Sequence, residues 1–93
     1  MVYLITYDLK SPNDTSYDYT RVIDALKAIY PTWCHLEKSV WLVVSLLDAA
    51  AVRDSLTPYL YKGDVLFAAR LQGNWASRTL DANQIEWLKD RTF

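Results

Sequence analysis

Hydrophobic and polar positions along the chain fall into blocks that predict alternating strands and helices. Four apolar runs rich in aromatic and β-branched residues predict strands: Val2–Asp8, Trp33–Glu37, Val40–Leu46 and Val65–Leu71. Three stretches with apolar residues on one helical face, or with a capping residue in front, predict helices: Tyr17–Tyr30, Ala49–Thr57 and a short segment from Asp81 to Arg91.

Residues that begin or end elements separate these blocks. Pro31 and Pro58 end the first two helices because proline lacks the N–H that a helix interior needs. Asp48 and Asp81 precede the second and third helices, where a carboxylate caps free backbone N–H groups. The polar stretch 9–16 predicts a loop, and the sequence Lys62-Gly63-Asp64 predicts a tight turn.

The order of these elements is β-α-β-β-α-β followed by a short C-terminal helix. It predicts an α+β fold of the ferredoxin-like kind. In that fold the first and third strands are central, both crossovers are right-handed, and both helices cover one face of the sheet. The other face is then open. Because the chain is rich in aromatic residues, an open face favours a partner, most commonly a second copy.

Composition narrows the class of protein. The chain has 93 residues, 52% hydrophobic and 14% aromatic. This length predicts one domain over residues 1–93, with a core that needs no disulfide or structural metal. Four Trp and seven Tyr exceed what a small core buries, which places some at an interface. The single cysteine, Cys34, allows no internal disulfide and is typical of a reducing compartment.

Charge and hydropathy exclude further classes. The net charge is −1, and the sequence contains no run of like charge, whereas an electrostatic nucleic-acid binder carries a basic stripe. The N-terminal apolar run lacks a basic leader and stops at Asp8, unlike a signal peptide. No apolar stretch has the length of a membrane span. We expect a cytoplasmic protein, with no membrane association and no small-molecule cofactor implied.

The carboxylate of Asp8, at the end of the first predicted strand, has two interpretations. It can accept backbone hydrogen bonds in the turn at Leu9 and Lys10. It can instead bind a hard cation such as Mg²⁺, which prefers oxygen ligands and keeps several waters. Such an ion could polarise a phosphate and lower the pKa of an attacking water. Both interpretations stay open.

Aromatic and hydroxyl side chains near the strand ends are further candidates. Tyr7 and Ser39 could orient a phosphate, although packing and a hairpin turn also explain them. Tyr3, Tyr7, Trp33 and Trp41 could stack nucleic-acid bases, but the sequence lacks the Gly-aromatic pattern of RNA-recognition sheets. We therefore favour a core or a dimer interface for them. If Asp8 faces the open side of the sheet, Tyr3 and Tyr7 lie beneath the helices.

Cys34 and His35 are adjacent on the second predicted strand. Adjacent strand residues point to opposite faces, so these two form neither a metal site nor a nucleophile pair. No second Cys or His completes a zinc site. We predict a core cysteine and a surface histidine. His35 and Glu37 share a face with Trp33, which leaves an acid–base pair open.

Several short motifs resemble the CRISPR-associated protein two family. Leu4-Ile5-Thr6-Tyr7-Asp8-Leu9 is similar to that family's first strand, and Lys38-Ser39-Val40-Trp41 is similar to its Ser-Val-Phe segment. The chain is more similar still to stand-alone, Cas-two-like relatives of the SinR family. That likeness covers nearly the whole chain and includes these positions: Tyr7-Asp8, Trp33, Trp41, Pro58-Tyr59 and Trp87-Leu88-Lys89.

The resemblance implies a homodimer of ferredoxin-like domains associated with RNA or DNA. The family aspartate that Asp8 matches lies near the dimer axis and is proposed to bind a divalent metal. Asp8 is thus the implied ligand for Mg²⁺ or Mn²⁺ and the catalytic residue of a weak endonuclease. Lys10, Arg70 and Arg78 are then the candidate phosphate contacts.

The same resemblance also implies an alternative without catalysis. Many family members act as architectural dimers that hold nucleic acid. The chain also differs from the family in and after the first loop, where Asn13-Asp14-Thr15 replaces the usual arginines. The alternative function is therefore a non-enzymatic architectural or protein-interaction dimer in which Asp8 is structural.

Overall fold

The computed structural model describes residues 1–10, 15–91 and 93. Within these residues the chain is an α+β structure with these elements: β1 (Val2–Asp8), α1 (Thr15–Ile29), β2 (Trp33–Glu37), β3 (Val40–Val44), α2 (Ala49–Leu56), the 3₁₀ helix η1 (Thr57–Tyr59), β4 (Val65–Leu71) and α3 (Ala82–Lys89). The chain order of strands and helices follows the prediction. The Asn13-Asp14-Thr15 difference and the predicted loop fall largely on residues 11–14, outside the described residues.

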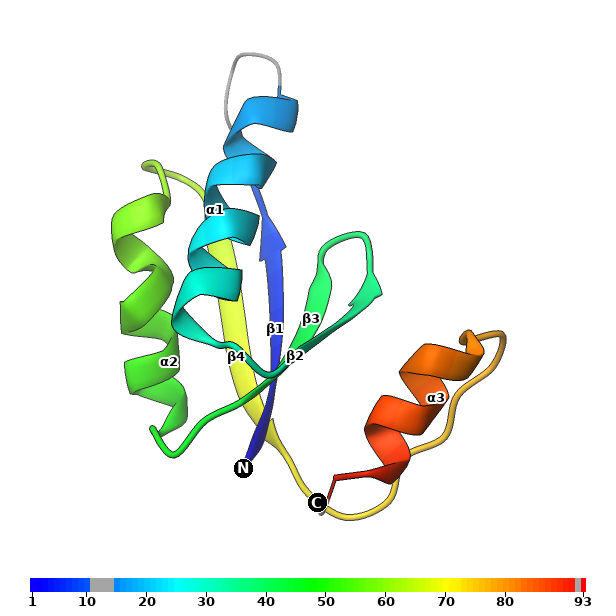
Figure 1. The fold of residues 1–93 in the computed structure, drawn as a ribbon. Helices are drawn as coiled ribbons and strands as arrows, with labels where there is room; N and C mark the ends of the chain where they lie inside the picture. Colours follow the sequence, from blue (N-terminus) through cyan, green and yellow to red (C-terminus); the bar gives the residue numbers. More distant parts are fainter. Residues whose placement is uncertain (11–14, 92) are drawn as a thin grey trace.

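The four described strands form one sheet in the order β2-β3-β1-β4. Every neighbouring pair is antiparallel, so β1 and β3 are central, as the sequence predicted. Helices α1 and α2 lie on one side of this sheet and α3 lies on the other (Figure 1). The sheet is thus a middle layer between two helices and one short helix.

The face beneath α1 and α2 holds the larger hydrophobic cluster. Tyr3, Ile5 and Tyr7 of β1 are at most 4% exposed. Buried residues from the two helices and from β3 complete this cluster: Val22, Leu26, Val52, Leu56, Trp41 and Val43. Because strand side chains alternate, Leu4, Thr6 and Asp8 point to the opposite face. Asp8 thus lies on the face opposite the two helices, and Tyr3 and Tyr7 lie beneath them, as expected for that direction of Asp8.

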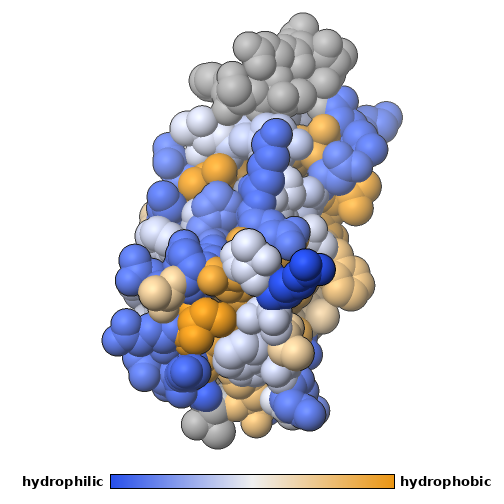
Figure 2. Space-filling model, turned by 90° about the vertical axis from the view of Figure 1, so that its right-hand side faces the viewer, coloured by the Kyte–Doolittle hydropathy of each residue, from blue (hydrophilic) through white to orange (hydrophobic). Residues whose placement is uncertain are grey.

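The opposite face carries a second, smaller cluster under α3. Val2, Cys34, Leu42 and Leu88 are buried in it. The prediction of a wholly open second face is therefore wrong at this end of the sheet, because α3 folds back over it. Figure 2 views the side on which α3 lies and shows hydrophobic surface between polar side chains.

Local signals explain where most elements begin and end. The Asp48 carboxylate accepts from the Ala51 N–H at 2.8 Å, and Asp81 forms a reciprocal capping box with Gln84 at the start of α3. β3 ends at Val44, two residues earlier than predicted. There the Ser45 N–H donates to the Met1 carbonyl at 2.9 Å, and Leu46 is left 92% exposed.

Candidate functional site

Asp8 ends β1 as an exposed carboxylate in an ion pair. Its side chain is 62% exposed, and the Lys10 Nζ lies 2.6 Å from its Oδ2. The hydrogen bond to Asp8 and the charge of that carboxylate raise the pKa of Lys10 above its usual value. The structure therefore brings together two of the four predicted site residues, with opposite charges that neutralise one another.

The turn beside Asp8 is held by a different carboxylate, Asp64. The backbone N–H of Lys10 donates to Asp64 Oδ1 at 2.7 Å, and the N–H of Tyr61 donates to Asp64 Oδ2 at 2.8 Å. Gly63 takes φ +91°, which a side chain would strain. The Lys10 N–H therefore donates to Asp64, from the predicted Lys62-Gly63-Asp64 turn, and not to Asp8.

The described residues place no cluster of metal ligands around Asp8. Mg²⁺ is held by one or two carboxylates together with waters, and the neighbouring Lys10 ammonium repels a cation. Among the residues that the structure describes, no group of three or more His, Cys, Asp or Glu is placed to hold a metal.

The other two predicted phosphate contacts lie apart from Asp8. Arg70 pairs with Tyr3 in the β1–β4 register, whereas Asp8 pairs with Val65, so Arg70 lies about 16 Å farther along the strands. Arg70 also belongs to the helix-covered face by alternation, and Arg78 lies in the loop after β4. Within one protomer these cations do not form a continuous basic surface.

The aromatic side chains of the central strands are core residues. Tyr3 is 2% exposed, Tyr7 4% and Trp41 1%, so none of them presents a ring to a nucleic-acid base. The Trp41 indole Nε1–H donates to the Tyr7 hydroxyl at 3.0 Å. Burial raises the pKa of Tyr7, although this hydrogen bond opposes the shift. Of the two placements predicted for these rings, a core or a dimer interface, the structure shows the helix-covered core for these three residues.

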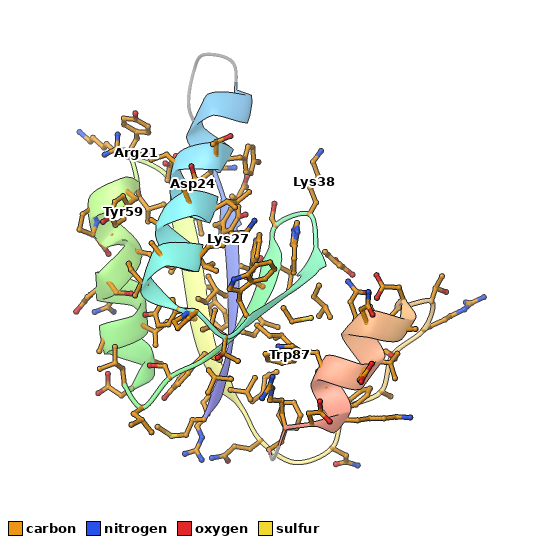
Figure 3. All side chains as sticks on the ribbon, viewed as in Figure 1. Arg21, Asp24, Lys27, Lys38, Tyr59 and Trp87 are labelled. Atoms are coloured by element: carbon orange, nitrogen blue, oxygen red, sulfur yellow. The ribbon has the colours of Figure 1, made fainter. Side chains whose placement is uncertain are left out.

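Two polar side chains, those of Lys27 and His35, lie against the tryptophans of the β2–β3 hairpin. The His35 ring stacks parallel on Trp41 with centroids 3.9 Å apart, and Trp33 meets Trp41 edge-on. Lys27 extends from α1 towards this hairpin (Figure 3), and its Nζ lies 4.8 Å from the Trp33 ring centroid. His35 is exposed and Cys34 is buried, as predicted. Lys27 was missed because no sequence signal tells which helix residue meets the hairpin.

The second face of the sheet is exposed at the end that α3 does not cover. Val65 is 53% exposed and Phe67 58%, and the partly exposed Thr6 and Val40 lie beside them in register. We call Thr6, Val40, Val65 and Phe67 the open half of the sheet, with Asp8 at its edge. At this end the second face is open, as the predicted fold implied, although the sequence did not identify Val65 and Phe67 as its exposed residues.

A cavity of about 310 Å³ adjoins the open half. It lies between the sheet, the loop after β4 and α3, and its lining includes Leu4, Leu42, Trp75, Arg78 and Leu88. Its walls are largely leucine side chains, so it suits an apolar group. The open half and this cavity together form a largely apolar surface on this side of the described molecule.

Comparisons with known proteins do not assign this surface. No protein-family model matches the chain, and no curated protein matches it significantly. None of the helices in the described part of the chain is long and apolar enough to cross a membrane.

Proposed function

We propose that the chain is a ferredoxin-like, Cas-two-like protein that works as a non-enzymatic architectural homodimer in the cytoplasm. The observation that carries the proposal is the exposed pair Val65 and Phe67 in the open half of the sheet. The β-α-β-β-α-β order and the strand order β2-β3-β1-β4 support the ferredoxin-like assignment. The Tyr7-Asp8 and Lys38-Ser39-Val40-Trp41 motifs support the Cas-two-like one.

A second copy of the chain doubles each apolar contact that an interface over the open half makes. A fully buried Phe or Val side chain contributes about 1.5–3 kcal/mol relative to an exposed one. In a two-fold interface each residue is buried twice, once from each protomer. Val65 and Phe67 therefore supply four buried side chains to a dimer, while a monomer leaves all of them in water.

The charges at the edge of the open half suit the same partner. Asp8 and Lys10 carry opposite charges and lie side by side. A two-fold interface brings a patch against itself, so a patch of one sign would repel its copy. The open half has one acid and one base at its edge, so it does not repel its copy in this way.

The test compares two charge insertions at exposed apolar positions. Phe67→Glu places a carboxylate in the open half, and Leu46→Glu places one at the most exposed apolar residue after β3. Sedimentation equilibrium should give a dimer for the wild type and for Leu46→Glu, and a monomer for Phe67→Glu. A monomeric wild type, or a Phe67→Glu variant as dimeric as the wild type, would contradict the proposal.

The second candidate function is metal-dependent cleavage of RNA or DNA. It is favoured by the exposure of Asp8 at the edge of the open half, because a two-fold axis near that edge would pair two Asp8 carboxylates around one Mg²⁺ or Mn²⁺. Lys10, Arg70 and Arg78 would then be the phosphate contacts. Cleavage that requires Mg²⁺ or Mn²⁺ and disappears in Asp8→Asn supports this candidate; cleavage that survives in Asp8→Asn rules it out.

A further inference from the structure

We propose that Phe67 of each protomer inserts into the cavity beside α3 of the other protomer. The proposal rests on the proposed homodimer and specifies how its two copies meet. It identifies the cavity as the binding site for one aromatic side chain, supplied by a second copy of this chain.

Phe67 and the cavity lie on the same face of the sheet. Phe67 pairs with Thr6, and Leu4, the next residue of β1 on that face, lines the cavity. A diagonal neighbour on an antiparallel pair is about 7–8 Å away. A protruding ring and an apolar cavity are therefore close neighbours on one surface. The ring of Phe67 does not fill the cavity of its own protomer, since its side chain is 58% exposed.

Two-fold symmetry turns this proximity into a reciprocal contact. A two-fold axis that lies in the interface, midway between a protrusion and a cavity, exchanges their positions. The Phe67 ring of one protomer then meets the cavity of its partner, and the reverse contact forms at the same time. With the axis at this position, each cavity holds the Phe67 ring of the other protomer, and both rings are buried.

The size and chemistry of the cavity suit a phenyl ring. The cavity measures about 310 Å³, and an apolar cavity of about 150 Å³ already takes up benzene. Leu36, Leu42 and Leu88 supply apolar walls, and Ala76 leaves room at the loop side. The lining also holds two residues of opposite charge, Glu37 and Arg78, both exposed in the single protomer.

A dimer with this geometry fits the architectural function and does not allow the two Asp8 carboxylates to share a metal ion. Asp8 lies farther along β1 from the cavity than Thr6, the residue that pairs with Phe67. The axis between Phe67 and the cavity then places the two Asp8 residues on opposite sides, on the order of 10 Å apart or more. A Mg²⁺ ion binds its ligand oxygens at about 2.0–2.1 Å, so these carboxylates cannot share one ion.

The test is disulfide formation between two singly substituted chains. Phe67→Cys protein is mixed with Ala76→Cys protein, since both positions are exposed and neither substitution touches the core. The mixed dimer keeps one intact Phe67 and one intact cavity. Leu46→Cys mixed with Ala76→Cys is the matched control for random collision, and wild-type protein controls for the buried Cys34.

At roughly 10 µM protein, an effective thiol concentration in the mM range should make the Phe67→Cys and Ala76→Cys disulfide form about a hundredfold faster than the Leu46→Cys control. Equal rates for the two mixtures, with a dimer still present by sedimentation, would overturn the insertion and leave the proposed dimer standing. Faster pairing of Phe67→Cys with itself would also overturn the insertion. A monomeric wild type would overturn both proposals.

Discussion

The two faces of the sheet differ in how completely they are covered, although both are apolar. Between the sheet and its two covering helices, Ile5 of β1 and Leu26 of α1 are fully buried, whereas Phe67 on the other face is 58% exposed. Phe67 stays exposed because α3 is shorter than the strand over which it lies. α3 has eight residues and spans about 12 Å, while the seven residues of β4 span about 23 Å. One short helix therefore covers one end of that face, and the remainder is available to a partner.

The polar groups of the two faces differ in the same way. On the helix-covered face the Trp41 indole N–H is buried and donates to the Tyr7 hydroxyl. At the edge of the open half, Asp8 and Lys10 form an ion pair in water, where such pairs contribute little. The first face is thus closed by internal contacts, and the second keeps its charged groups free to exchange partners.

The largest expected effect is a substitution on the closed face. Trp41→Ala should lower the free energy of unfolding by about 3–5 kcal/mol, because it removes a buried ring and leaves a cavity. Urea denaturation followed by circular dichroism measures this loss. Leu46→Ala, at an exposed position, is the control and should change the free energy by less than about 0.5 kcal/mol. Similar losses for the two variants would contradict the burial of Trp41.

A smaller effect is expected under α3. Leu88→Ala should lower the free energy of unfolding by about 2–3 kcal/mol, the low end for a buried leucine, because α3 packs on a single face and can relax into the space. Lys89→Ala, an exposed neighbour on the same helix, is the control. If Leu88→Ala were as stable as Lys89→Ala, α3 would not cover this end of the sheet.

The smallest effect is a dependence of stability on alkaline pH. Burial raises the pKa of the Cys34 thiol above its ordinary 9.0. Above that pH the unfolded chain loses this proton while the folded chain keeps it, so stability falls as pH rises. Denaturation between pH 8 and pH 10 should show a smaller decrease in Cys34→Ala than in the wild type. An identical decrease in both would contradict the burial of this thiol.

Elements with local signals could be predicted from the sequence. β1, β2 and β4 have their predicted bounds because apolar runs end at polar or turn residues. The caps at Asp48 and Asp81 follow from a carboxylate placed before a helical stretch. The burial of Tyr3 and Tyr7 could be predicted only on the condition that Asp8 points to the open face, because side chains alternate along a strand.

The candidate site depends on contacts between distant residues, and these could not be predicted. Asp64 replaces Asp8 as the turn acceptor for Lys10 across 54 positions of the chain. The position of α3 over Leu42 depends on the path of the loop between β4 and α3. No local sequence pattern determines that path. β4 is apolar at successive positions, so alternation did not distinguish the exposed Phe67 from its covered neighbours.

The most direct test of the uncovered face is a dilution series of amide NMR spectra. If the open half binds a second copy, dilution through the dimer dissociation range should shift the amide signals of Thr6, Val40 and Phe67. The signals of Val22 in α1 and Val52 in α2, both buried in the cluster between these helices and the sheet, should stay in place. Spectra that do not change on dilution, or shifts confined to α1 and α2, would contradict the account.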